Sequence, residues 1–208
     1  MTGPLRTARR FLDRLSRDAQ GATVVEFALV IIPFLILLLG GLDLGYQAYL
    51  RAVVQGALND VARAGSMEAP VIGCEGETVE DRIGCAIERR SDTVARDATY
   101  RIEIKNYFDF AGIGRSEKLV TDYNGNGSYD EGDCFEDLNE NGAFDESAGR
   151  DGVGGADDVV FYEVTAEMPR LFPVQKFMGV ADTYEITATA AIRSQPYARQ
   201  KLPPTVCA

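Results

Sequence analysis

The sequence predicts an α+β protein in which a long N-terminal helix packs on a small antiparallel sheet. Three observations predict this fold class: an apolar run of transmembrane length near the N-terminus, a helical pattern of apolar residues after it, and three later segments of alternating polarity. An acidic, glycine-rich insertion at residues 121–158 separates the first two alternating segments. The 208 residues suffice for one modest domain besides an anchor.

Residues 22–44, ATVVEFALVIIPFLILLLGGLDL, have roughly the length that a helix needs to cross a hydrocarbon core of ~30 Å. We expect Pro33 to kink this helix or to free a backbone carbonyl. The apolar core exceeds the roughly 7–15 residues typical of a cleaved secretory signal, and Tyr46-Gln47-Ala48 is a poor cleavage site. The sequence therefore favours a retained transmembrane anchor.

Charge is distributed asymmetrically around the apolar run. The first 21 residues hold five arginines and two acids, whereas residues 121–158 hold twelve acids and one base, Arg150. The positive-inside rule therefore predicts a single-pass inner-membrane protein with a cytoplasmic N-terminus and a domain at residues 67–208 in the periplasm or on the cell surface. One stretch supplies the net charge of −11, so the whole-protein charge is a poor guide; nucleic-acid binding is not expected because no basic face is available for phosphates.

Four cysteines follow the apolar run: Cys74, Cys85, Cys134 and Cys207. An even count beyond a membrane anchor indicates an oxidising compartment and two disulfides. Three pairings are open; Cys74 with Cys85 is the local one and would leave Cys134 for Cys207. The alternative is four buried free thiols in a cytosolic protein. Since the chain has no histidine and no nucleophile motif, we do not expect an enzyme.

Beyond the membrane, apolar residues recur every three or four positions and predict that the helix continues over residues 45–66. This stripe could pack on the protein's own sheet or on a neighbouring subunit's helix, and we expect both along different parts of its length. A second helix is expected over residues 78–90. Strands are expected over residues 100–105, 159–168 and 184–192, and no element is expected in the tail from residue 194.

The start of the apolar run resembles the processing site of type IV prepilins of the Flp (tight-adherence) class. It carries Gly21, Ala22, Glu26 and Phe27 in the order of that site. The resemblance implies that residues 1–21 are a basic leader, that a prepilin peptidase cuts between Gly21 and Ala22, and that Glu26 becomes the fifth mature residue. Phe27 takes the aromatic position that follows the glutamate.

The longer run from Gly21 to about Ser66 resembles the TadE/TadG-like pseudopilin family of Flp-type pilus assembly. The residues that carry the resemblance are Gly21, Val25, Glu26, Phe27, Ala28, Leu29, Pro33, Tyr46, Arg51 to Gln55, Ala57, and Ala62 to Ala64. It implies a pilin-like fold and a minor pilin or pseudopilin that meets other pilin subunits through its N-terminal helix. Some relatives are anchored but not processed.

Glu26 has a plain physical role in such a protein. After cleavage the amine of Ala22 is a cation near the start of the helix, and the carboxylate of Glu26 could neutralise it within the low-dielectric bilayer. The pair would set the stagger between neighbouring helices, so we expect Glu26 and Phe27 to act in assembly. The alternative is an interfacial carboxylate that reaches the headgroups.

The acidic insertion contains two copies of a calcium-loop spacing. Loop 1 (residues 122–133) has oxygen-bearing side chains at positions 1, 3, 5, 9 and 12, namely Asp122, Asn124, Asn126, Asp130 and Asp133. Loop 2 (residues 137–148) has them at positions 1, 3, 5 and 9, namely Asp137, Asn139, Asn141 and Asp145. Position 12 of loop 2 is Ala148, and the candidates to close it are Asp151, Asp157 and Asp158.

The three residues between the loops leave no room for the helices of an EF-hand pair. We therefore expect bare loops that bind calcium structurally by neutralising repelling carboxylates. The alternative is a disordered acidic segment. At the level of function, the sequence predicts a minor pilin or pseudopilin, with a permanently membrane-anchored, calcium-dependent adhesin or binding module as the alternative.

Overall fold

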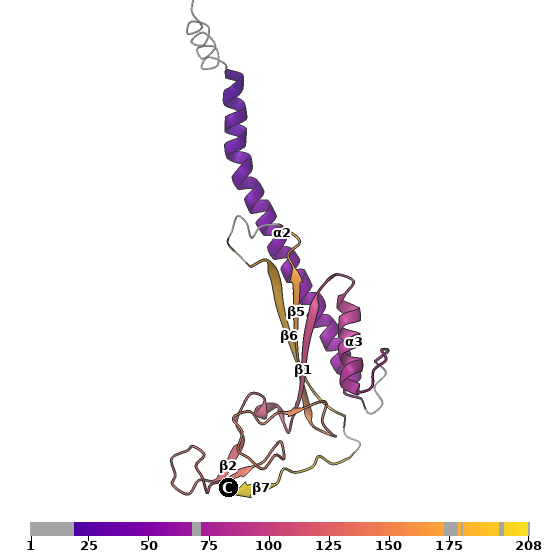
Figure 1. The fold of residues 1–208 in the computed structure, drawn as a ribbon, viewed down its shortest axis with the longest axis vertical. Helices are drawn as coiled ribbons and strands as arrows, with labels where there is room; N and C mark the ends of the chain where they lie inside the picture. Colours follow the sequence, from indigo (N-terminus) through magenta and orange to yellow (C-terminus); the bar gives the residue numbers. More distant parts are fainter. Residues whose placement is uncertain (1–18, 68–71, 173–178, 180, 196–197, 208) are drawn as a thin grey trace, which may run out of the picture. The chain divides into compact units, whose positions relative to one another are not determined.

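The computed structural model describes residues 19–67, 72–172, 179, 181–195 and 198–207. It confirms the α+β class, with one long apolar helix and two antiparallel sheets (Figure 1). The chain divides into two compact units, Met1–Tyr46 with Arg170–Asp182, and Gln47–Pro169 with Thr183–Ala208, which are described separately. The elements are α2 (Ala19–Gly65), α3 (Val79–Ser91), β1 (Thr99–Tyr107), a 3-10 turn (Phe110–Gly112), β2 (Lys118–Thr121), β3 (Cys134–Glu136), β4 (Arg150–Asp151), β5 (Val159–Pro169), β6 (Thr183–Arg193) and β7 (Thr205–Cys207).

Helix α2 is continuous through the two segments that the sequence predicts as helical, and Pro33 lies inside it. Its 18-residue apolar window has a mean hydropathy of 2.6, so the helix is long and apolar enough to cross a membrane. In the N-terminal half of α2, large apolar side chains are exposed to solvent; Leu29 is 72% exposed and Leu37 is 76% exposed. The predicted leader lies almost wholly outside the described residues.

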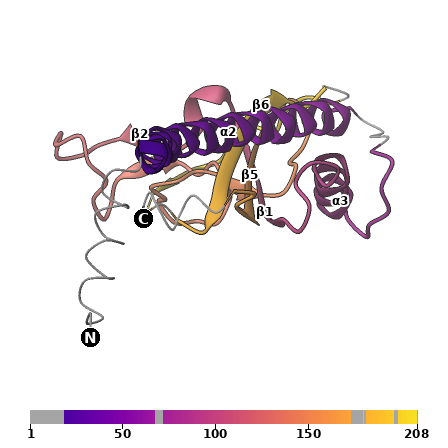
Figure 2. The ribbon, with the colours of Figure 1, turned by 90° about the horizontal axis from the view of Figure 1, so that it is seen from above.

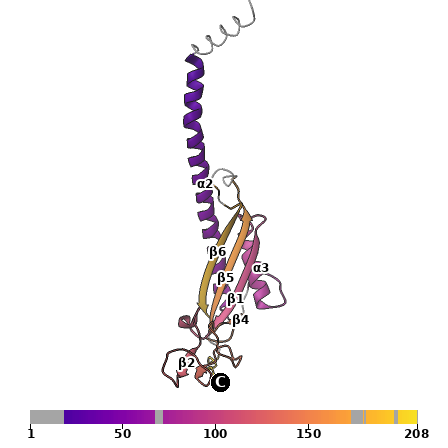
Figure 3. The same cartoon turned by 60° about the vertical axis from the view of Figure 1, so that its left-hand side comes forward.

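The main sheet has the strand order β4-β1-β5-β6, and all its pairs are antiparallel (Figure 3). Burial alternates along β5 and β6, so one face of the sheet is buried and the other is open. The C-terminal part of α2 and α3 supply the covering layer, and they lie near each other in two views (Figures 1 and 2). The core cluster includes Val54, Leu58, Val61, Ile83, Ile87, Val160, Tyr162, Val164 and Ala188.

Residues at both ends of helix α3 stabilise its termini. Thr78 caps it, with a hydrogen bond from the Asp81 N–H to the threonine hydroxyl and one from the Thr78 N–H to the aspartate carboxylate. Arg89 and Arg90 lie in the last turn, where cations stabilise the helix dipole. A disulfide from Cys85 to Cys74 ties the preceding loop to this helix.

A second sheet, with the order β2-β3-β7, was not predicted from the sequence. The tail forms its last strand, so the expectation of no element after residue 194 was wrong. Cys134 and Cys207 are directly opposed in β3 and β7 and form the second disulfide. The prediction of two disulfides is confirmed. Of the three pairings left open, the structure has Cys74 with Cys85 and Cys134 with Cys207. Strands of three residues are too short to show a periodic pattern.

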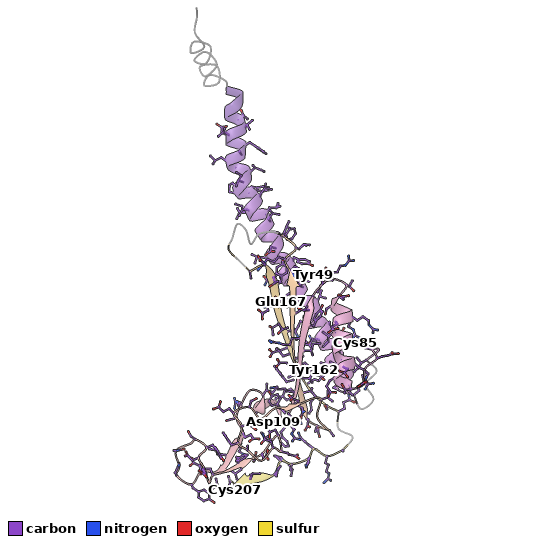
Figure 4. All side chains as sticks on the ribbon, in the orientation of Figure 1. Tyr49, Cys85, Asp109, Tyr162, Glu167 and Cys207 are labelled. Carbon is purple, nitrogen blue, oxygen red and sulfur yellow. A yellow bond between two sulfur atoms is a disulfide. The ribbon has the colours of Figure 1, made fainter. Side chains whose placement is uncertain are left out.

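Tyr162 of β5 (labelled in Figure 4) is fully buried, and its hydroxyl has no hydrogen-bond partner among the described residues. Burial raises the pKa of Tyr162 to about 12, and the negative charge of Glu80 adds to the effect. In the unfolded chain the phenol ionises near pH ~10. The free energy of unfolding should therefore fall by about 1.4 kcal/mol per pH unit between these values because of this residue.

We predict that Tyr162→Phe removes this fall and is neutral or stabilising at pH 8, because it deletes an unpaired hydroxyl. Urea unfolding of the full chain in detergent at several pH values from 8 to 12 measures both effects. Tyr123→Phe is the matched control, since Tyr123 is 75% exposed and should change neither. A loss of several kcal/mol at pH 8 in Tyr162→Phe would contradict the prediction.

Candidate functional site

The residues predicted to act in assembly lie in the first half of α2. Glu26 and Phe27 are exposed, Phe27 at 65%, and no described residue covers them. Gly21 and Ala22 belong to the helix, but their exposure and contacts lie outside what the structure describes. The pairing of Glu26 with the amine of Ala22 therefore stays a prediction.

The two predicted loops begin in the same way. In loop 1, the first carboxylate, Asp122, accepts a hydrogen bond of 2.7 Å from the N–H of Gly127 at position 6. In loop 2, Asp137 accepts one of 2.8 Å from the N–H of Gly142, also at position 6. Both glycines have φ of +79°, a conformation that other residues rarely adopt. Each loop therefore turns sharply around its first carboxylate.

The asparagines and the carboxylate at position 9 also match between the loops. In loop 1 the side-chain amides of Asn124 and Asn126 donate to one oxygen of Asp130, at 2.6 and 2.7 Å. The same two contacts in loop 2 join Asn139 and Asn141 to Asp145. The structure thus brings together, in each loop, the side chains that the sequence predicts at positions 3, 5 and 9, while the carboxylate at position 1 accepts from backbone N–H groups of the same loop.

Asp133 closes loop 1 from position 12. Its Oδ1 accepts from the N–H of Tyr123 at 3.0 Å, and its Oδ2 accepts from the N–H of Asp130 at 2.9 Å. These two amides belong to positions 2 and 9 of the loop. Asp133 is 2% exposed, so this carboxylate sits inside the loop.

Glu117, which the sequence analysis missed, makes the same two contacts in loop 2. Its Oε1 accepts from the N–H of Leu138 at 2.7 Å, and its Oε2 accepts from the N–H of Asp145 at 3.2 Å. These are again positions 2 and 9, and Glu117 is also 2% exposed. A carboxylate from just before β2 therefore occupies the place that Ala148 cannot fill.

The three acids that we expected as candidates to close loop 2 lie elsewhere. Asp151 pairs with Lys105 in the β4–β1 ladder. Asp157 lies 3.8 Å from the guanidinium of Arg193, and Asp158 accepts hydrogen bonds from the N–H of Gly155 and from the side chain of Gln200. The only sequence signal for Glu117 was the missing carboxylate at position 12.

Strand β3 and three aromatic rings join the loops to each other. The rings of Tyr129 and Phe144, one from each loop, stack with centroids 4.4 Å apart. Phe135 of β3 meets both edge-on at 5.5 Å and is fully buried. Cys207, labelled in Figure 4, fixes the other side of β3 through the disulfide. The two loops therefore share one small core.

The electrostatics of the loops favour a cation. Burial raises the pKa of Glu117, and the charge of Asp137 adds to this, whereas hydrogen bonds from three backbone N–H groups oppose it. The pKa of the more exposed Asp122 is lowered, chiefly by the N–H of Gly127. In the described part of the chain, no lysine or arginine forms an ion pair with Glu117 or with any aspartate predicted as a ligand.

The donor set consists entirely of oxygen, which suits calcium. Within the described residues, no three acidic or cysteine side chains converge to hold a metal by themselves. A calcium ion in either loop would therefore depend on asparagine and backbone carbonyl oxygens as well as on the carboxylates. On donor chemistry, the residues fit a weak oxygen-ligand site.

Comparison with known proteins bears on one part of the chain. No curated protein and no solved structure matches it. Residues 21–63, about a fifth of the chain, match the model of a family described as TadE-like protein. This match lies within α2 and confirms the resemblance predicted from Gly21, Glu26 and the residues that follow. The segment that carries the apolar run and its helical continuation is thus similar to the TadE-like family.

Proposed function

We propose that this protein is a minor pilin or pseudopilin subunit that takes part in assembly of a Flp-type (tight-adherence) type IV pilus. The observation that carries the proposal is the coincidence of two features in α2. The first half of the segment similar to the TadE-like family carries apolar side chains that the protein leaves exposed, from Val24 to Leu44, and its second half packs into the core. An uncovered apolar helix suits a subunit that moves from lipid into a bundle of helices.

The remaining features support this placement. The basic N-terminal segment and the acidic remainder favour a cytoplasmic N-terminus and a periplasmic or surface domain. Both disulfides belong to that domain, as expected in an oxidising compartment. In this proposal, prepilin peptidase cuts after Gly21, and the other pilin subunits meet α2 through its exposed face.

Glu26 supplies register during assembly. It lies at the N-terminal edge of the uncharged stretch that ends at Leu42, where a carboxylate needs a partner or access to headgroups. The amine of Ala22 becomes that partner on cleavage, within its own chain or in a neighbour. A pair between chains stabilises one axial stagger over the others.

We predict that the protein purified from its native membranes starts at Ala22, and that Glu26→Gln abolishes its incorporation into fibres while leaving the fold intact. Intact mass and terminal sequencing give the start, and immunoblots of sheared fibres give incorporation. Glu185→Gln, an exposed glutamate of β6, is the matched control and should assemble normally.

A start at Met1, together with normal assembly of Glu26→Gln, would replace the pilin proposal with a permanently anchored accessory protein. A start near Tyr49 would indicate ordinary secretion, and the helix would then have no role in assembly.

Calcium is the second part of the proposal: each loop binds one ion, and the ions order the acidic insertion. The equivalence of Glu117 and Asp133 supports this, because it gives both loops a closing carboxylate of the same geometry. Glu117 is buried near the negative charge of Asp137, and a cation would relieve such like-charge repulsion. Dissociation constants near 10⁻⁴–10⁻³ M are typical of extracellular modules of this kind.

We predict that the full chain in detergent, after chelation, binds two calcium ions by titration calorimetry. Glu117→Gln should weaken one site by ~10-fold or more, and Asp133→Asn should weaken the other, because each removes one ligand charge. Glu131→Gln, an exposed acid within loop 1 that is not among the predicted ligands, is the control and should leave both sites unchanged. Two unaltered sites in Glu117→Gln would show that Glu117 is not a ligand.

The alternative function is a permanently anchored, calcium-dependent adhesin. The observation that favours it is Tyr123, a 75% exposed aromatic residue at the start of loop 1. Asp122→Ala separates the two functions. Normal fibres with lost surface attachment would favour the adhesin, and unaltered attachment would favour the structural subunit.

A further inference from the structure

An ion pair joins α2 to the hairpin that connects β5 and β6. The guanidinium Nη1 of Arg170 lies 2.5 Å from Oδ2 of Asp43, and the two side chains are 11% and 6% exposed. Arg170 also donates through Nε to the carbonyl of Ala181 at 2.6 Å, and its N–H donates to the carbonyl of Asp182 at 3.1 Å. One arginine thus closes the base of the hairpin and holds it against the helix.

The position of Asp43 along the apolar run places the ion pair near the C-terminal end of the proposed membrane span. Asp43 follows Glu26 by 17 residues, and no charged residue lies between them. As a helix this interval covers about 25 Å, which is less than the ~30 Å of a hydrocarbon core. One of the two carboxylates must therefore approach the hydrocarbon edge, and Asp43 carries a cation that cancels its charge.

Exposed leucines flank both members of the pair in the sequence, although Asp182, whose carbonyl accepts from the N–H of Arg170, is also exposed. Leu42 and Leu44, on either side of Asp43 in the sequence, are 50% and 65% exposed. Leu171, next to Arg170, is 60% exposed, although it begins a connection between two strands, where polar residues are usual. These residues belong to the same compact unit as the apolar run.

We propose that the base of the β5–β6 hairpin, residues 170–172, is a second membrane contact that lies in the lipid interface at the C-terminal end of the apolar run. The inference rests on the membrane span proposed above and is continuous with it. Because Asp43 enters the interface together with the helix, Arg170 enters with it and brings Leu171 into contact with lipid. The pair thereby fixes the depth at which the span ends.

The experiment uses the absence of tryptophan from the chain. Leu171→Trp, in the full chain reconstituted into phosphatidylcholine–phosphatidylglycerol bilayers, provides a single emitter whose depth is read with brominated lipids. Leu35→Trp, near the middle of the run, is the reference for a residue within the hydrocarbon core. Tyr123→Trp, in the polar loop 1, is the reference for a residue in water. We expect Trp at 171 to emit to the blue of Trp at 123. Bromines near the glycerol end of the acyl chains should quench it more than bromines near the methyl end.

A second variant tests the role of the ion pair. The double variant Asp43→Asn with Arg170→Met removes both charges, so that neither is left buried without its partner. We expect it to reduce the quenching of Trp at 171 and to leave the quenching of Trp at 35 unchanged. Emission and quenching of Trp at 171 that equal those of Trp at 123, with Trp at 35 still quenched, would overturn the hairpin contact and leave the membrane span standing. Loss of quenching at both 35 and 171 would overturn the span and this inference together.

Discussion

The exposed apolar half of α2 is the constraint on which the rest of the molecule depends. Thirteen large apolar side chains between Val24 and Leu44 are exposed. Removing that many from water is worth on the order of tens of kcal/mol, since each contributes roughly 1.5–3 kcal/mol when fully buried. The stability of a typical domain is smaller than this. Covering the segment with lipid or with other helices would therefore contribute more free energy than folding a typical domain does.

Because the run is apolar, the carboxylates of Glu26 and Asp43 at its two ends each need a partner of opposite charge or access to a polar surrounding. Asp43 has its partner within the chain, because Arg170 neutralises it in the folded subunit. Glu26 is exposed, and its proposed partner, the amine of Ala22, appears only on cleavage. One end of the run is therefore neutralised within the folded chain, whereas in the proposed function the other end gains its partner only on cleavage. Such an asymmetry suits a helix whose N-terminal end is exchanged between lipid and a fibre while the C-terminal end keeps its domain.

The sequence predicted the features whose signals are local. Period-two alternation located β1, β5 and β6, helical spacing located α2 and α3, and ligand spacing aligned the two loops. It missed the β2-β3-β7 sheet, whose short strands depend on pairing with residues far away and on the disulfide from Cys134 to Cys207. Glu117 and Arg170 were missed for the same reason, because each acts on residues far along the chain and neither belongs to a local pattern.

The two loops and the C-terminal tail form one cooperative assembly through β3. The closing carboxylate of loop 1 directly precedes Cys134, and the first carboxylate of loop 2 directly follows Glu136. The tail pairs with β3 through β7, and the N–H of Asp137 donates to the carbonyl of Pro204. Lys201 also forms an ion pair with Glu140 of loop 2. The loops and the tail are therefore linked through one strand, and the disulfide lowers the entropy cost of ordering them together.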